Sequence, residues 1–250
     1  MPQSGHLPAG AGATGQLSAD RLAAVTFDMD GLLVDSEPLW FQAEGAVMAR
    51  LGADWGPADQ HALVGGSLGS TVAYLIAKAG AAADPAVVGR WLIETMVDLV
   101  RAQPLTVLPG TAELIAEVRA AGLPHALVTS SVPAIVDAVV GRLDVRFDVV
   151  ISGADVTHAK PDPEGYLLAA AKLGVDPRRC IALEDSPNGV AAAERAGFRV
   201  VAVPSVVPVA ARPGRVMLST LAGVSLADLG TRTGLVAGPS RPAPGSPLIG

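Results

Sequence analysis

Short apolar segments that alternate with helical patterns constrain the fold of this chain more than any other feature. Five such segments are apolar, contain β-branched side chains and are bounded by polar or turn-forming residues: 23–28, 125–130, 149–152, 181–185 and 199–204. Runs of this length are typical of buried strands, whereas helices need about ten residues or more. Strands that alternate with helices predict a parallel sheet covered on both faces. We therefore expect an α/β fold with a doubly wound, Rossmann-like parallel sheet.

Four segments between these runs have helical periodicity, and their boundaries carry helix signals. The predicted helices cover 111–121, 133–143, 163–173 and 186–196. Glycines follow three of them, as is common where a helix ends in a left-handed residue: Gly122, Gly174 and Gly197. Ser186 and Pro187 stand in the order of an N-cap and a first-turn proline. Each helix can therefore connect two parallel strands across a face of the sheet.

One long segment, 38–105, interrupts this alternation. Helical stripes of apolar residues run through it without a strand pattern, and the first consists of Trp40, Ala43, Val47 and Leu51. We predict that 38–105 forms a helical cap domain. The cap would be inserted into a core domain made of 20–37 and 106–229.

The two ends of the chain differ in composition from the rest. Residues 1–19 are expected to form a flexible arm and 230–250 a disordered tail, since both are rich in small and polar residues. The beginning, MPQSGHLPAGAGATGQLS, has neither the basic start nor the apolar middle of a secretion signal. The single cysteine, Cys180, excludes an intramolecular disulfide and is expected in the core. A reducing, cytoplasmic location is the natural interpretation.

Charge and hydropathy limit the range of partners. The formal net charge is −6, aromatic residues make up 4% of the chain, and basic residues form no run. Nucleic acid is therefore not expected as a partner, because phosphate-backbone binding needs clustered Lys and Arg. No apolar stretch approaches the length of a membrane span. We expect a monomer without a membrane or nucleic-acid partner.

Polar side chains cluster where the predicted strands end. The clusters are Asp28 and Asp30 after the first strand, Thr129 and Ser130 after the second, Lys160 in a loop after the third, and Glu184 and Asp185 at the end of the fourth. Ligands of open α/β sheets bind outside the carboxyl ends of the strands. We therefore expect all four clusters to meet in one crevice.

The residue types in this crevice favour phosphate chemistry. Several carboxylates close together repel one another and are costly to bury unless a cation neutralises them. Mg²⁺ prefers such oxygen ligands, and Lys160 would add a second positive charge. A cation, a lysine and a hydroxyl together suit a dianionic phosphoryl group, whose transfer needs mainly positioning and charge neutralisation. A phosphorylated small molecule is the expected substrate.

Four motifs, in this order, resemble the haloacid dehalogenase (HAD) superfamily. They are FDMDGLLVDSEPLW, VTSS, AKPDPEGY and ALEDSPNG, and the similarity covers roughly residues 23 to 205. The chain looks like the branch with a helical cap, which includes β-phosphoglucomutases and sugar-phosphate phosphatases. The opening DGLLVDSEPLW is most similar to 2-deoxyglucose-6-phosphate phosphatases.

The resemblance implies a role for each polar residue of the core. Asp28 would attack phosphorus and form an aspartyl phosphate, and Asp30 would serve as general acid and then general base. Thr129 and Ser130 would bind the phosphoryl group, and Lys160 would balance charge around it.

The same resemblance implies a Mg²⁺ site. Asp28, Asp185 and the backbone carbonyl of Asp30 would hold the ion, and Glu184 would act on it directly or through water. Three histidines lack the spacing of metal ligands, and we assign no metal to them: His61, His125 and His158.

Three alternatives are weighed against a phosphatase. Dehalogenases lack the second aspartate, so Asp30 argues against them. β-Phosphoglucomutases carry a histidine where this chain has Trp40 and a cap arginine where it has Leu68, which disfavours a mutase without excluding it. A non-enzymatic binder of phosphorylated metabolites is the alternative of another class.

The candidate contacts to the leaving group are the loop 65–70 and Trp40. Trp40 could also be part of the cap core.

Overall fold

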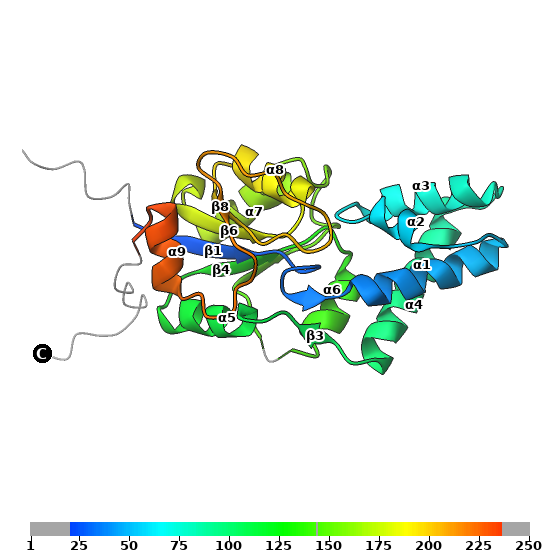
Figure 1. The fold of residues 1–250 in the computed structure, drawn as a ribbon, viewed down its shortest axis with the longest axis horizontal. Coiled ribbons are helices and arrows are strands. Elements are labelled where there is room, and N and C mark those ends of the chain that lie inside the picture. The colour runs from blue at the N-terminus through cyan, green and yellow to red at the C-terminus, as the bar shows by residue number, and fades with distance from the viewer. Residues whose placement is uncertain (1–20, 144, 237–250) are drawn as a thin grey trace, which may run out of the picture.

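The central feature of the structure, a computed structural model that describes residues 21–143 and 145–236, is a six-stranded parallel sheet (Figure 1). The spatial order is β5-β4-β1-β6-β7-β8, and every neighbouring pair is parallel. The strands are β1 Ala24–Phe27, β4 His125–Val128, β5 Val149–Ile151, β6 Cys180–Glu184, β7 Arg199–Ala202 and β8 Val216–Met217. The predicted sheet and its five predicted strands are confirmed. The sixth, β8, is only two residues long, too short for a recognisable sequence pattern.

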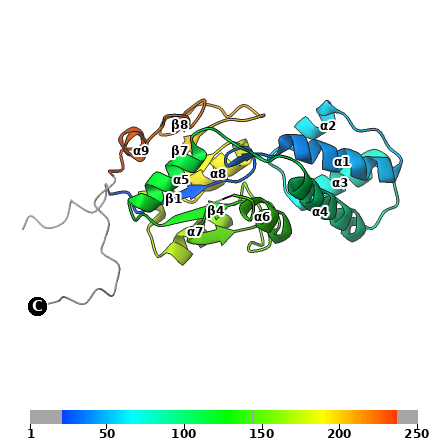
Figure 2. The same cartoon turned by 90° about the horizontal axis from the view of Figure 1, so that it is seen from below.

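Helices cover both faces of the sheet, as predicted. Helices α5 (Thr111–Ala120) and α9 (Leu226–Thr233) lie on one face, and α7 (Glu164–Leu173) and α8 (Pro187–Arg195) lie on the other (Figures 1 and 2). A single 3-10 turn, Pro177–Arg179, leads into β6. No helix in the described ranges is long and apolar enough to cross a membrane.

The alternation of side chains along β6 explains why both faces are sealed. Ile181 and Leu183 belong to the apolar cluster on the α5 side, whereas Cys180 and Ala182 belong to the cluster on the α7 and α8 side. All four side chains are fully buried. A central parallel strand must be apolar on both faces, which is why its sequence is a continuous apolar run rather than an alternating one. The predicted core position of Cys180 is thereby confirmed.

Four helices between β1 and β4 lie beyond the carboxyl edge of the sheet, and we call them the helical cap (Figures 1 and 2). They are α1 Glu37–Leu51, α2 Pro57–His61, α3 Leu68–Ala79 and α4 Pro85–Ala102. A short antiparallel pair, β2 (Val34–Asp35) and β3 (Thr106–Val107), flanks the cap in sequence. On the core side, α6 (Pro133–Val140) packs against α4. The assignment of 38–105 as a separate domain stays a proposal.

The prediction of a disordered tail over 230–250 is wrong for its first residues. Helix α9 runs to Thr233, with Ser225 as its N-cap in a capping box with Asp228. Leu235 is only 2% exposed, and the carbonyl of Val236 accepts a hydrogen bond from the Leu22 amide at 3.0 Å. Apolar burial of this kind outweighs a polar local composition. Residues 237–250 and the predicted arm 1–19 lie outside the described ranges.

Leu235→Ala should lower the free energy of unfolding by about 2–3 kcal/mol, because it removes a buried side chain from the core and leaves a cavity. The matched control is Val236→Ala, where the side chain is 67% exposed and the change should stay within about 0.5 kcal/mol. Urea denaturation of both variants measures the difference. Equal stabilities would contradict the inclusion of this segment in the fold.

Candidate active site

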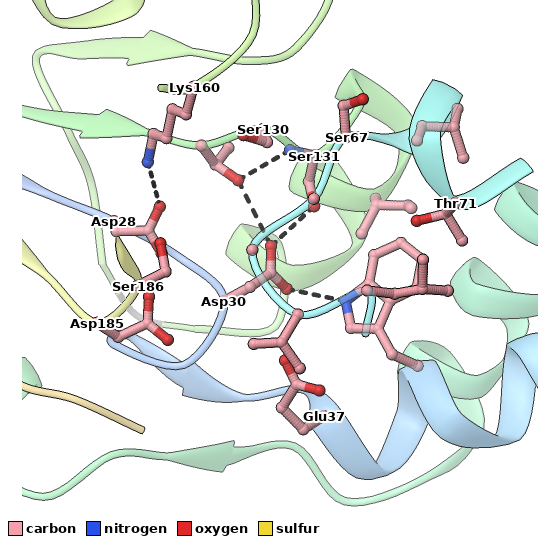
Figure 3. A pocket seen from close by; sticks show the side chains of 18 of the residues that line it. Asp28, Asp30, Glu37, Ser67, Thr71, Ser130, Ser131, Lys160, Asp185 and Ser186 are labelled. Carbon is pink, nitrogen blue, oxygen red and sulfur yellow. Dashed lines mark hydrogen bonds and ion pairs between the residues drawn. The ribbon is translucent and has the colours of Figure 1, made fainter. Parts of the chain in front are cut away.

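A pocket between the carboxyl edge of the sheet and the helical cap gathers most of the predicted site residues (Figure 3). The core contributes Asp28, Asp30, Thr129, Ser130, Lys160 and Asp185, and the cap contributes Trp40 and the loop residues Gly65 to Leu68. Of the eight residues predicted for the site, Glu184 alone does not line the pocket. Glu184 lies behind Lys160 and forms an ion pair with it.

Lys160 is buried between two carboxylates. Its Nζ lies 2.6 Å from Oδ1 of Asp28 and 2.6 Å from Oε1 of Glu184, and it donates to the carbonyl of Val128 at 2.8 Å. The hydroxyl of Tyr166 donates to the same Glu184 oxygen at 2.6 Å, and its ring centroid is 5.3 Å from the ammonium. Burial alone would lower the pKa of Lys160, but the charges of Asp28 and Glu184 outweigh burial and raise it. The lysine therefore remains a fixed positive charge beside Asp28.

Lys160 cannot balance all the negative charge around it. Asp28, Glu184 and Asp185 each place one carboxylate oxygen within 4.8 Å of the others. Burial, followed by the charge of Glu184, raises the pKa of Asp185 to about 7. Burial also raises the pKa of Asp28 well above its usual range; Lys160 opposes this shift, and the other two acids add to it. A hard divalent cation would remove this repulsion, and carboxylate oxygens are the donors that Mg²⁺ prefers.

Glu184 also holds the loop that begins α8. Its Oε2 accepts hydrogen bonds from the amide of Asp185 at 3.2 Å and from the hydroxyl of Ser186 at 3.4 Å. A Cβ added at Gly189, in the first turn of α8, would lie 2.0 Å from the Glu184 carboxylate. The motif ALEDSPNG thus ends in glycine because the helix passes directly over this carboxylate.

Donors from the core and the cap fix the second aspartate, Asp30 (Figure 3). Its Oδ1 accepts from the hydroxyl of Ser36 at 2.6 Å and from the indole of Trp40 at 3.2 Å. Its Oδ2 accepts from the hydroxyl of Ser131 at 2.8 Å and lies 3.5 Å from that of Thr129. Asp30 therefore has a defined orientation toward the pocket.

Two of these donors were not predicted for the site. Ser131 is the last serine of the VTSS motif, in which only Thr129 and Ser130 were predicted for the site, and Ser36 directly precedes α1. A sequence signal for Ser131 is its spacing of two residues from Thr129, because a hydroxyl side chain often accepts from the amide two residues later. In the structure the Ser131 amide donates to the Thr129 hydroxyl at 3.0 Å. Trp40 packs against the core cluster and lines the pocket, and its contact to a leaving group stays a prediction.

The cap side of the pocket carries polar residues that the sequence did not single out. Glu37, Glu44 and Gln60 line it, and Gln60 donates to the Glu37 carboxylate at 3.1 Å. Burial, followed by the charge of Asp30, raises the pKa of Glu37 to about 7. Burial and then Glu37 raise the pKa of Glu44 to about 8. Both acids face the pocket from α1, so this wall is polar and acidic.

The loop 65–70 meets the core at the start of α8. The side-chain amide of Asn188 donates to the carbonyl of Gly65 at 3.1 Å. Gly65 has a φ of 72°, and a Cβ there would lie 3.0 Å from Cβ of Ser186. The contact between cap and core is therefore close enough to favour glycine at this position.

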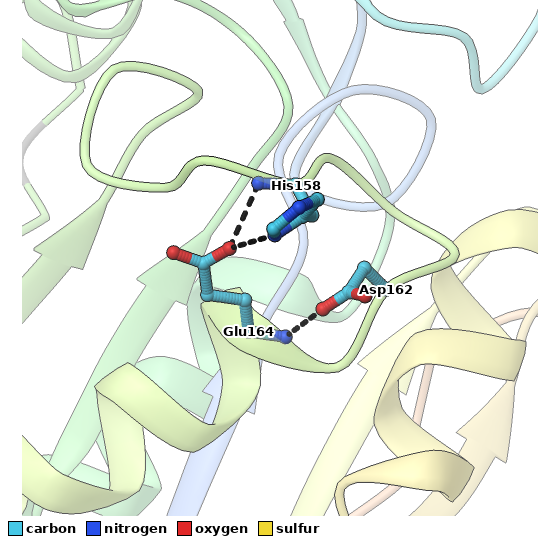
Figure 4. Close-up of side chains that lie close together, drawn as sticks. All are labelled: His158, Asp162 and Glu164. Atoms are coloured by element: carbon cyan, nitrogen blue, oxygen red, sulfur yellow. Dashed lines mark hydrogen bonds and ion pairs between the residues drawn. The ribbon is translucent and has the colours of Figure 1, made fainter.

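A second cluster of potential metal ligands lies outside the pocket (Figure 4). Glu164 accepts hydrogen bonds from the amides of Thr157 at 2.9 Å and His158 at 2.8 Å, and Asp162 accepts from the Glu164 amide at 3.0 Å. These bonds fix the loop that leads into α7 and account for the cluster. We therefore assign no metal to it.

Gly189→Ala should reduce the free energy of unfolding by about 1–3 kcal/mol, because the new methyl group collides with the buried Glu184 carboxylate. Gly89→Ala in α4 is the matched control. There a Cβ would meet Val72 at an ordinary 3.7 Å, and the helix should gain about 0.5–1 kcal/mol. Urea denaturation compares the two variants. A Gly189→Ala protein as stable as wild type would contradict the close approach of α8 to Glu184.

Two curated relatives match over almost their whole length. Hexitol phosphatase B of Escherichia coli K12 is 36% identical over 218 residues, which cover 84% of this chain and 95% of that protein. Fructose-1-phosphate phosphatase YqaB of the same strain is 31% identical over 190 residues, which cover 74% of this chain and 97% of that protein.

A solved structure and a family model agree with these relatives. CbbY from Rhodobacter sphaeroides, in complex with phosphate, superposes with a TM-score of 0.76 at 31% identity, covering 83% of this chain and 99% of that one. The sequence model of the haloacid dehalogenase-like hydrolases matches residues 22–197. The chain therefore belongs to the haloacid dehalogenase-like hydrolase family.

Proposed function

We propose that this hydrolase is a Mg²⁺-dependent phosphatase that removes phosphate from small phosphorylated metabolites, and from sugar phosphates in particular. The observation that carries the proposal is Asp28, held at the end of β1 by Lys160 and facing a pocket shared with Asp30 and Asp185. Two curated relatives above 30% identity carry the names of phosphatases for a hexitol phosphate and a fructose phosphate. Both names agree with a phosphate monoester as the substrate class.

Asp28, Asp185 and the backbone carbonyl of Asp30 would hold the Mg²⁺ ion. Bound there, the ion would offset the excess carboxylate charge and the charge of the substrate phosphate. Glu184 would act on the ion through water or through its charge. Its Oε1 pairs with Lys160, and its Oε2 holds the start of α8. Asp185 is itself oriented by the hydroxyl of Ser205, which donates to it at 2.5 Å.

The reaction would proceed in two displacements at phosphorus. In the first, an Asp28 oxygen forms a bond to phosphorus while the bond to the leaving oxygen breaks, and Asp30 gives its proton to that oxygen. In the second, Asp30 takes a proton from a water molecule that attacks phosphorus, and the bond to Asp28 breaks. Thr129 would donate to a phosphoryl oxygen, and Lys160 would stabilise the charge that develops there. The hydrogen bonds of Asp30 to Ser36, Trp40 and Ser131 would keep it in line for both proton transfers.

The pocket favours hydrolysis over the mutase alternative. A mutase must hold a bisphosphate, which requires a second cationic site. Among the described residues that line the pocket, Lys160 is the only lysine or arginine, and it already pairs with Asp28 and Glu184. Trp40 stands at the position of the mutase histidine and donates instead to Asp30.

Hydrolysis of an aryl phosphate tests both the function and the metal. Wild-type protein should release phosphate with Mg²⁺, lose activity in EDTA and regain it when Mg²⁺ is added back. Asp185→Ala should raise the Mg²⁺ concentration for half-maximal activity by about tenfold or more, because a ligand is lost. Asp137→Ala, an exposed acid on α6, is the control. No Mg²⁺-dependent hydrolysis would overturn the proposed function, and an unchanged Mg²⁺ requirement in Asp185→Ala would exclude Asp185 as a ligand.

The reaction outcome separates phosphatase from mutase. Given β-glucose 1-phosphate with a trace of the 1,6-bisphosphate, the protein should release inorganic phosphate and should not accumulate glucose 6-phosphate, because no second cationic site lines the described pocket. Phosphorus NMR of the mixture follows both products. Efficient conversion to glucose 6-phosphate would support the mutase instead.

A further inference from the structure

The cap side of the pocket holds a buried carboxyl group with an unpaired oxygen. Glu44, in the middle of α1, is 3% exposed and lines the pocket. Within the described residues, its Oε2 has no hydrogen-bond partner. Leaving such a buried atom without a hydrogen-bond partner is energetically unfavourable. Inside a substrate pocket, a hydrogen-bond donor that arrives with the ligand explains the unpaired oxygen most directly.

Glu37 stands two helical turns before Glu44 and faces the same pocket. Gln60 of α2 donates to its carboxylate at 3.1 Å and to its backbone carbonyl at 2.7 Å, which orients the side chain. Burial, followed by the charge of Glu37, raises the pKa of Glu44 to about 8, and burial, followed by the charge of Asp30, raises the pKa of Glu37 to about 7. Near neutral pH each carboxyl group can therefore both accept and donate hydrogen bonds.

Among the residues that the structure describes, no basic side chain forms an ion pair with Glu37 or Glu44. Lys160 is the one lysine or arginine among the described residues of the pocket wall, and Asp28 and Glu184 occupy it. In the cap, Lys78 pairs with Asp59 at 2.6 Å and does not line the pocket. A second phosphate on this side would meet two carboxyl groups and no cation to offset its charge, so the pocket should disfavour it.

A neutral polyhydroxylated leaving group fits these conditions. Each hydroxyl group is a donor and an acceptor, which matches a carboxyl group in either protonation state. A substrate hydroxyl that hydrogen-bonds an otherwise unpaired buried group also lets the pocket discriminate strongly between substrates. An analogue without that hydroxyl would leave the protein group unpaired.

We propose that Glu44, with Glu37 beside it, is a specificity-determining residue that binds hydroxyl groups of a polyol or sugar monophosphate and excludes bisphosphates. The proposal rests on the proposed phosphatase function and names the part of the substrate that the cap recognises. The phosphoryl end would bind at Asp28 and Lys160, and the hydroxylated end would lie against α1.

The test compares kcat and KM of wild type, Glu44→Leu and Glu44→Gln. The substrates are glucitol 6-phosphate, fructose 1-phosphate, fructose 1,6-bisphosphate, glucosamine 6-phosphate and p-nitrophenyl phosphate, which lacks hydroxyl donors on its leaving group. Glu94→Gln is the matched control, since Glu94 is an exposed acid on α4 of the cap. Wild type should prefer the two hydroxylated monophosphates to the bisphosphate by at least about tenfold in kcat/KM.

Glu44→Leu should lose about tenfold or more in kcat/KM on the hydroxylated monophosphates, mainly through KM, and less than about threefold on p-nitrophenyl phosphate. Glu44→Gln, which keeps a donor and an acceptor, should recover part of the loss. An equal loss on all substrates would show a structural role and overturn the proposal. A wild-type preference for glucosamine 6-phosphate that disappears in Glu44→Leu would indicate an ammonium site and would also overturn it. Absence of p-nitrophenyl phosphate hydrolysis by wild type would instead defeat the proposed function itself.

Discussion

The rest of the site depends on the ion pairs that the buried ammonium group of Lys160 forms with Asp28 and Glu184. Strands β1 and β6 are neighbours, with Phe27 opposite Leu183, so Asp28 and Glu184 leave the sheet side by side. Two adjacent carboxylates at the end of a buried sheet repel each other, and Lys160 lies 2.6 Å from both. Removing one partner from such a buried cluster typically costs about 3–5 kcal/mol. The negative charge that remains, with Asp185, is what makes the site receptive to a divalent cation.

The cap is coupled to this chemistry through hydrogen bonds rather than through proximity alone. Asp30 lies in the core loop, yet Ser36, directly before the first cap helix, and Trp40, inside that helix, donate to it. On the far side of the pocket, Asn188 of α8 binds the carbonyl of Gly65 in the cap loop. The residue proposed to move protons is therefore oriented by the segment proposed to enclose the leaving group. Enclosure of this kind strengthens each electrostatic contact by excluding water.

Strong local patterns made most of the fold predictable. Short apolar runs such as the one that begins 181–185 are typical of buried strands, and Ser186 with Pro187 is a common signal for a helix start. The two-residue strands β2, β3 and β8 have no local signature, and burial of Leu235 depends on tertiary contacts that composition does not reveal. For the site, strand ends pointed to Asp28 and Lys160. Glu44 could not be identified, because an acid in an amphipathic helix is usually solvated, and only the folded cap shows it buried.

In the proposed reaction Asp28 carries the phosphoryl group during turnover. Acid quench within milliseconds of mixing with a ³²P-labelled sugar phosphate tests this step most directly. Peptide mapping should find base-labile label on the peptide that contains Asp28. The Asp28→Asn protein should show no label and less than about a tenth of wild-type kcat, which raises the barrier by more than about 1.4 kcal/mol. Turnover without label at Asp28, or an Asp28→Asn protein that keeps more than this activity, would contradict the account.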